Sequence, residues 1–194
     1  GSATSTGSFG AGRFVGNVSI GNANPDVYEV SGNNLVVGSG TGHEGITIVA
    51  GTSSNSSLHF ADGTSGADSY RGAVAYVHNG NYMRFDTNAL ERMRIDEDGQ
   101  VGIGLTNQDD YYAKDLVLLA ANQGGITIKG GTSESQYLMF ADGNSGGARY
   151  AGYIQYDHNL DQMFFATAAS TRVDIDSTGI NVRSGGNISG SSTS

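Results

Sequence analysis

Four aspartates that recur in matching places are the first residues in this chain whose type and spacing could support catalysis. Asp62 and Asp142 each precede a glycine, and Asp96 and Asp176 each open a short polar stretch. An enzyme that cleaves glycans needs two carboxylates about 5 to 9.5 Å apart. An aspartate that opens a turn, however, accepts hydrogen bonds from its own backbone. We favour this capping role, because two identical catalytic sites in one chain would be unusual, and we expect no catalytic residue.

Calcium binding is a second chemistry that these carboxylates could support. Residues 96–99 (DEDG) and 174–179 (DIDSTG) are rich in oxygen ligands. An EF-hand loop, however, takes its ligands through about twelve positions and closes with a glutamate. Neither stretch has that glutamate, so both are interpreted as hairpin turns.

Two histidines could bind a transition metal if several chains met. His78 and His158 occupy the same place in two similar segments, and three chains around an axis could bring three imidazoles together as ligands. Each histidine lies two residues after a tyrosine and next to an asparagine, so we favour a hydrogen-bonded hairpin residue. His43 and His59 have no counterpart. We expect no metal and no cofactor.

The sequence lacks the other common catalytic motifs. It contains no cysteine, and no Gly-x-Ser-x-Gly elbow leads into a helix. Residues 38–42 (GSGTG) are glycine-rich, but they carry no lysine and open no helix, so they are not a phosphate loop. The sequence therefore predicts a protein that is not an enzyme.

Tyrosines offer a possible contact with sugars. An exposed tyrosine stacks on sugar rings, but β-sheets also use tyrosine for packing while its hydroxyl stays in water. The relevant residues are Tyr70, Tyr76, Tyr82, Tyr137, Tyr150, Tyr153 and Tyr156. The most plausible binding surfaces are loops that differ between two otherwise similar segments, residues 52–57 against 132–137 and 64–71 against 144–151.

Composition narrows the partners further. The chain has 194 residues with a net charge of −9, 31 glycines and no cysteine. Its only lysines are Lys114 and Lys129, so it has no basic cluster to bind nucleic acid. No apolar run approaches the roughly 20 residues that span a bilayer, and no signal peptide is recognised. Without disulfides, stability must come from packing or from partner chains.

An internal duplication positions these candidates. Residues 45–99 align with residues 125–179 at a constant offset of 80, without a gap, and 27 of the 55 aligned positions are identical. The preceding segments, residues 18–40 and 101–120, match more loosely. The sequence therefore predicts a linker at residues 1–17, a first module at 18–100, a second at 101–183 and a linker at 184–194. The related ends GSATS and GSSTS suggest a piece of a longer array, or alternatively an expression scar and coincidence.

Each module shows the period of two that is typical of β-strands with one apolar face. The paired apolar positions are Ile46 and Ile48, Leu58 and Phe60, Val74 and Tyr76, Met83 and Phe85, Met93 and Ile95, and Val101 and Ile103. Residues 78–81, 96–99 and 176–179 are predicted hairpin turns, with Gly99 and Gly179 in left-handed conformation. Residues 88–93 are too short for a helix. The predicted class is all-β.

A thin apolar face of short strands is marginal in water. It could curl into a closed sandwich or bury the same face against identical chains, and the repetition favours identical chains.

The residues that carry a family resemblance lie in residues 17–38, 70–104 and 148–182. The Tyr-x-His-Asn hairpin, the Arg-x-x-Ile-Asp strand and Gly-Ile-Gly, with Pro25 nearby, follow one another there. This order resembles the repeat modules of tailed-bacteriophage tail fibres, over nearly all of residues 4–182. The resemblance implies an elongated, fibrous β-rich homotrimer in the shaft of an extracellular virion fibre. It also implies partnership with other fibre or baseplate proteins, and no segment matches the self-cleaving chaperone domain of that family.

Alternative functions stay open from the sequence. The chain could itself bind a host surface glycan through its variable loops. It could be a depolymerising, tailspike-like enzyme. It could also belong to a bacterial surface adhesin or another extracellular filament built from similar modules.

Overall fold

The computed structural model describes residues 17–183 except residues 23, 30 and 33, and in this part of the chain it is all-β. The strands are joined by short turns and 3-10 helices, and the described residues contain no α-helix. This confirms the predicted class, including residues 88–93, which form a turn and the start of a strand. The predicted linker 184–194 and nearly all of linker 1–17 lie outside the described residues.

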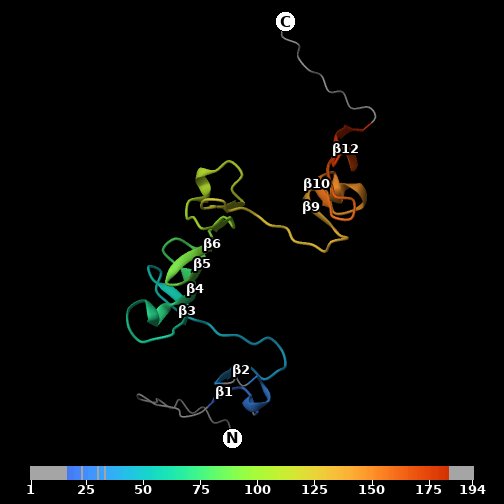
Figure 1. Cartoon of the computed structure of the whole chain (residues 1–194). Coiled ribbons are helices and arrows are strands. Elements are labelled where there is room, and N and C mark those ends of the chain that lie inside the picture. Colours follow the sequence, from blue (N-terminus) through green and yellow to red (C-terminus); the bar gives the residue numbers. More distant parts are fainter. Residues whose placement is uncertain (1–16, 23, 30, 33, 184–194) are drawn as a thin grey trace. The chain divides into compact units, whose positions relative to one another are not determined.

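The first large sheet has six strands in the order β3-β4-β5-β6-β7-β8. Neighbouring strands are antiparallel except β7 and β8, which are parallel. Figure 1 shows the first four strands from cyan to green. The strands are β3 (Asn55–Phe60), β4 (Gly72–Val77), β5 (Tyr82–Thr87), β6 (Leu90–Ile95), β7 (Val101–Ile103) and β8 (Leu116–Leu118). Two 3-10 helices connect them, η2 (Gly66–Tyr70) and η3 (Gln108–Asp110).

The second large sheet has five antiparallel strands in the order β13-β12-β11-β10-β9, drawn in orange and red in Figure 1. Its strands are β9 (Ser135–Phe140), β10 (Gly152–Asp157), β11 (Gln162–Thr167), β12 (Ser170–Asp176) and β13 (Gly179–Val182), with η4 (Gly146–Tyr150) between β9 and β10. Strands β9, β10 and β11 begin and end 80 residues after β3, β4 and β5. The duplicated sequence therefore folds into a duplicated sheet.

The two segments that match more loosely in sequence, residues 18–40 and 101–120, also share a structural arrangement. A parallel pair joins β1 (Val18–Ile20) to β2 (Leu35–Val37), with η1 (Pro25–Val27) in the connection. The pair β7 and β8 repeats this arrangement around η3. Parallel strands need a long crossover, which residues 21–34 and 104–115 provide.

Contacts divide the described residues into two compact units, one up to residue 120 and one from residue 121. Strand β7 pairs with β6 through Met93 and Ile103, and β8 follows β7 in the same sheet. The strands that begin the second sequence repeat are therefore hydrogen-bonded into the first sheet.

The predicted turns are confirmed. Residues 78–81 join β4 to β5, residues 96–99 and Gln100 join β6 to β7, and residues 177–178 join β12 to β13. Gly99 and Gly179 have φ values of 83° and 138°, the left-handed region that glycine enters at least cost.

One predicted strand is wrong for the single chain. Residues 45–48 and their copy, residues 125–128, form no strand, although Ile46 and Ile48 alternate as a strand would require. Alternation specifies only which side chains share a face, and a strand also needs a hydrogen-bonded neighbour.

The predicted loops 52–57 and 132–137 are also only partly loops. Residues 55–57 belong to β3 and residues 135–137 to β9. Their side chains differ between copies because they lie in strands whose backbone pairing tolerates the differences.

The two-residue turn between β5 and β6 is strained in both copies. Asn88 and Ala89 have φ values of 55° and 57°, and Ala168 and Ala169 of 50° and 54°. Positive φ at both central residues is the type I′ arrangement that favours Asn-Gly, and an L-residue with a Cβ pays about 1–2 kcal/mol there.

Replacing Ala89 with glycine is therefore expected to raise the free energy of unfolding by about 0.5–1 kcal/mol. Urea denaturation of the full chain at fixed concentration measures the change. Ala73→Gly is the control, because Ala73 lies buried inside β4, away from any turn. Its substitution should destabilise, and a destabilising Ala89→Gly would contradict the turn assignment.

Candidate assembly surface

One face of each large sheet is apolar across every strand. In the first sheet Leu58 lies opposite Val74, and Val74 lies opposite Phe85. Phe85 in turn lies opposite Met93, and Met93 lies opposite Ile103. Ser56 of β3 also lies on this face, opposite Tyr76. The apolar residues of the face, here called the apolar face, are Leu58, Phe60, Val74, Tyr76, Met83, Phe85, Met93, Ile95, Val101, Ile103, Leu116 and Leu118.

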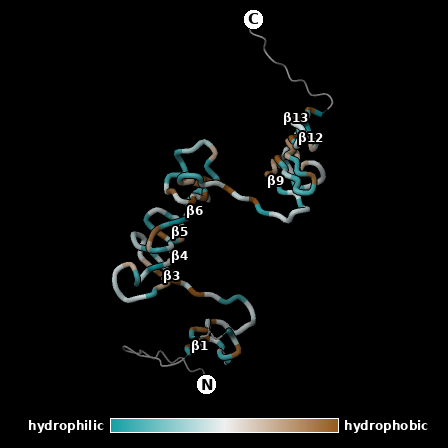
Figure 2. Tube along the Cα trace, viewed as in Figure 1, coloured by the Kyte–Doolittle hydropathy of each residue, from teal (hydrophilic) through white to brown (hydrophobic). Residues whose placement is uncertain are grey.

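The second sheet has an equivalent apolar face. It comprises Leu138, Phe140, Ile154, Tyr156, Met163, Phe165, Val173, Ile175, Ile180 and Val182. Figure 2 shows hydrophobic residues in both sheets and in the stretches that lead into β3 and β9. The predicted same-face pairs from Leu58 to Ile103 are thus confirmed.

This apolar face is not covered within the chain. Phe60 is 57% exposed and its copy Phe140 is also 57% exposed. Leu58, Leu116, Leu138 and Ile180 are exposed by more than half. The outer strands therefore present large hydrophobic side chains to solvent, while the central residues of the first sheet, such as Val74 and Phe85, are half-buried. Contiguous exposed apolar patches of this kind often mark interaction sites.

The small buried core of the first sheet lies on the opposite face. Ala73 and Ala75 are 5% and 2% exposed, and they alternate with the apolar face of β4. Gln108, 2% exposed, packs against Gly102, where a Cβ would come within 2.7 Å of its side-chain carbon. The glycine of Val101–Ile103 is thus needed for this close approach.

Comparison of the two copies shows which face was retained after duplication. Leu58, Phe60, Tyr76, Met83, Phe85 and Ile95 of the apolar face are identical in the second copy. On the opposite face the aligned residues differ at Ser57, His59, Ala73, Ala75, Val77, Tyr82, Arg84, Asp86 and Arg94. The apolar face thus keeps the same or a similar apolar side chain in both copies, as at Val74 and Ile154, whereas the opposite face changes in size, polarity and charge.

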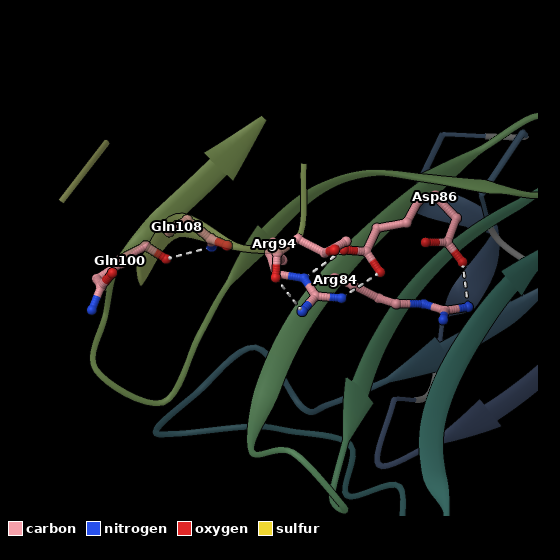
Figure 3. A network of polar contacts seen from close by, with 7 residues as sticks. Arg84, Asp86, Arg94, Gln100 and Gln108 are labelled. Carbon is pink, nitrogen blue, oxygen red and sulfur yellow. Dashed lines mark hydrogen bonds and ion pairs between the residues drawn. The ribbon is translucent and has the colours of Figure 1, made fainter. Parts of the chain in front are cut away.

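The opposite face of the first sheet carries a charged network that the sequence analysis missed. Arg84 donates from Nη2 to Asp86 Oδ2 over 2.7 Å, and the Asp86 side chain is only 5% exposed. Arg94 donates from Nε to Glu91 Oε1 over 2.5 Å and lies 4.1 Å over the ring of Tyr82. Figure 3 shows the two arginines on adjacent strands, each turned towards its own carboxylate.

Hydrogen bonding to Glu91, with its negative charge, raises the pKa of Arg94 above its ordinary value despite partial burial. The network is incomplete, because Arg84 Nε and Asp86 Oδ1 are buried without a partner. The second copy replaces Arg84 and Asp86 with Phe164 and Ala166, both buried. Alternation of differing and identical positions along the aligned copies was the signal that could have revealed this second face.

Two of the candidate carboxylates are turn caps, as the sequence analysis favoured. Asp96 Oδ1 accepts hydrogen bonds from the backbone N–H groups of Asp98 and Gln100, over 3.1 and 2.8 Å. Asp176 Oδ1 accepts from the backbone N–H groups of Thr178 and Gly179, over 2.7 and 3.2 Å.

The other two carboxylates behave differently. Asp62 faces Arg71 Nε at 3.4 Å rather than capping its own turn, and its copy Asp142 has alanine at the position of that arginine. Asp62 follows β3 and Asp96 follows β6, three strands away at about 4.8 Å per strand, or roughly 14 Å. They also lie at opposite ends of these antiparallel strands. Asp62 and Asp96 therefore do not form the carboxylate pair that glycan cleavage requires within one sheet.

Asp176 provides a test of the turn by pH. Hydrogen bonds from the hydroxyl and the backbone of Thr178 hold its pKa below the ordinary aspartate value. A folded pKa below the unfolded one gives stability that is present at neutral pH and is lost as pH falls through the folded pKa. We expect the unfolding free energy of Asp176→Asn to depend less on pH than that of the parent between about pH 2 and 5.

Urea denaturation across that pH range measures this slope, and an NMR titration of the Asp176 carboxyl gives its pKa directly. An ordinary pKa for Asp176 would contradict the capping geometry.

The histidines are hairpin residues in both copies. His78 Nε2 lies 3.1 Å from Ser56 Oγ, and the ring meets Tyr76 edge to face with centroids 5.0 Å apart. His158 meets Tyr156 in the same way at 4.9 Å. Within residues 17–183, as far as they are described, no three His, Cys, Asp or Glu side chains are grouped to hold a metal ion. His43 and His59 are exposed.

The tyrosines do not gather on one surface. Tyr76 and Tyr156 lie on the apolar faces, whereas Tyr137 and Tyr153 meet edge to face on the opposite face of the second sheet, with centroids 5.9 Å apart. Tyr70 and Tyr150, the last residues of η2 and η4, are 44% and 39% exposed. The Tyr156 hydroxyl donates to Asp161, which raises the pKa of Tyr156.

In the part of the chain that the structure covers, no helix has the length and apolar character needed to cross a membrane. The chain matches no protein-family model, and no curated protein is found that is similar to it in sequence. The resemblance to tail fibre modules therefore stays an expectation drawn from the motifs.

Proposed function

We propose that this chain is a non-enzymatic structural segment of a bacteriophage tail fibre, in which three identical chains bury their apolar faces together. The observation that carries this proposal is the retention of the apolar face in both copies, with Leu58 and Phe60 and their copies more than half exposed, while the opposite face diverged. A partner that contacts both apolar faces must itself carry two matching surfaces. Another, identical chain does so, because it contains the same two sheets.

The size of the faces supports assembly between copies. Strands spaced about 4.8 Å apart and rising about 3.3 Å per residue give each sheet a face of roughly 400 Å². Two such faces offer roughly 800 Å² per chain, the area that each partner contributes to a stable interface. One face alone falls short, which gives duplication a physical purpose.

The mechanism that this proposal assigns is mechanical. Repeated sheets set the length and stiffness of a shaft, and three chains hold distal adhesive sites close enough to act together. The number three and the setting in a virion rest on the motif resemblance.

Native mass measurement tests the proposal most directly. Sedimentation equilibrium of the 20.0 kDa chain should give three times the chain mass. A stable, compact monomer over the concentration range tested would overturn it.

Binding of a host surface glycan is the second candidate function. The exposed side chains of Tyr70 and Tyr150 favour it, because they belong to the connecting segments 64–71 and 144–151, whose other residues largely differ between copies. A glycan array probed with the purified chain separates the two functions: specific binding that Tyr70→Ala and Tyr150→Ala abolish would establish a binding module, and an array without signal would favour the shaft. Incubation with host polysaccharide tests the tailspike-like enzyme, which shortened chains would support.

A further inference from the structure

Each copy contains a segment with strand character that lacks a strand partner. Residues 45–48 and 125–128 have the identical sequence Gly-Ile-Thr-Ile. Ile46 and Ile48 are 67% and 49% exposed, and Ile126 and Ile128 are 74% and 53% exposed. In the described part of the chain these segments make no backbone–backbone hydrogen bond. The Ile48 carbonyl instead accepts from Ser56 Oγ over 2.9 Å.

Each copy also contains a strand edge that is open. Strand β3 ends the first sheet and β9 ends the second, so each has a neighbour on one side only. Such an edge presents unpaired N–H and C=O groups and readily accepts another strand. Both edges end in the same apolar residues, Leu58 and Phe60 or Leu138 and Phe140, and all four are more than half exposed.

We propose that residues 45–48 of one chain add as a strand to the open edge of β3 in a second, identical chain. In the same way, residues 125–128 of one chain add to β9 of the other. This inference rests on the proposed assembly of identical chains and states how their strands interlock. Strand addition satisfies the backbone groups of both elements through main-chain hydrogen bonds.

A second, identical chain is the partner that the repeated donor segments and strand edges favour. Each repeat offers one donor segment, and the edge strands β3 and β9 keep their leucine and phenylalanine at the spacing of 80 residues. The other two edges, β8 and β13, belong to strands that differ between the two sheets in length and in the direction of their pairing. Such head-to-tail pairing closes into a ring when the rotation permits. The side-chain alternation also fits, because Ile46 and Ile48 can extend the apolar face beside Leu58 and Phe60, which leaves Thr47 on the face of Ser57 and His59. The added strands thereby join the interface of roughly 800 Å² that the apolar faces provide.

Disulfide mapping tests this pairing, since the chain contains no cysteine of its own. Two double variants of the full chain, Thr47→Cys with His59→Cys and Thr47→Cys with Ser57→Cys, place cysteines on one face of the expected pair. Thr47→Cys with Leu58→Cys is the matched control, because a shift of one residue turns a side chain to the other face. Thr127→Cys with Met139→Cys repeats the test in the second copy, with Leu138→Cys as its control partner.

After mild oxidation, denaturing gels without reductant should show covalent dimers and trimers for at least one same-face pair. Their yield should exceed that of the control by at least about fivefold, because a disulfide needs Cβ atoms within about 4.5 Å. A link confined to single chains would mean that the segment folds onto its own β3 and would overturn the proposal. Equal yields for both pairs, or no link in any pair, would also overturn it.

The native mass of every variant, measured under reducing conditions, tests the proposed assembly of three chains separately from the strand exchange. A trimer without same-face links overturns only the strand exchange, whereas a monomer overturns the assembly as well.

Discussion

Replacing both Ile95 and Ile175 with aspartate is expected to leave folded but unassembled single chains. Ile95 lies between Met83 and Val101 on the first apolar face, and Ile175 lies between Met163 and Ile180 on the second. In an assembly the new carboxylates would be buried without partners, in addition to the lost burial of two isoleucines. We expect the association to weaken by at least about 4 kcal/mol, or roughly a thousandfold.

Sedimentation velocity measures the loss of assembly, and circular dichroism checks that the strand signal persists. The matched control adds the same charge at exposed turns, Asn79→Asp with Ser177→Asp, and should assemble like the parent. If the isoleucine variant also assembled like the parent, the apolar faces would not be the contact surface.

The second large effect is expected in the charged network of the first sheet. Asp86→Ala removes the carboxylate that holds Arg84, and Arg84→Phe leaves Asp86 buried without its counter-charge. We expect each single substitution to lower the free energy of unfolding by about 2–3 kcal/mol, below the cost of breaking a fully buried pair, because Asp86 is buried but Arg84 is only half-buried. The double variant recreates the Phe164 and Ala166 of the second copy and should lie within about 1 kcal/mol of the parent.

Urea denaturation at one fixed chain concentration gives the free energies of unfolding of the four proteins in this cycle, and a coupling of at least about 3 kcal/mol between the two sites. Lys114→Ala is the comparison, because Lys114 pairs with Asp109 at a similar 2.7 Å but both side chains are exposed. Its loss should cost far less than either single substitution of the Arg84–Asp86 pair, because solvent and salt screen an exposed pair. Additive effects of Arg84→Phe and Asp86→Ala would show that the pair does not act as a unit.

Much of the fold could be predicted from the sequence because it depends on local chemistry. The period of two predicted the strands from Leu58 to Ile103, and turn residues such as Gly99 and Gly179 predicted where they reverse. The constant offset of 80 residues predicted a repeated sheet, and Asp96 and Asp176 were correctly favoured as turn caps.

The sequence could not predict which strands find partners. Residues 45–48 alternate as well as β3 does, yet only β3 is paired, with β4. Strand pairing is a property of two segments, and the period of one segment carries no information about the other. For the same reason β7 and β8, which begin the second sequence repeat, lie in the sheet of the first unit.

The amino-acid sequence by itself determined that this chain forms two copies of one β-sheet, each with alternating apolar residues. Only the tertiary structure decided which side chains the chain covers for itself: Ala73, Ala75 and Asp86 are buried, while Phe60 and its copy Phe140 are left exposed. The physical reason is that alternation separates two faces without specifying what packs on either. Burial depends on which loops, helices and strands the three-dimensional path of the chain brings over each face.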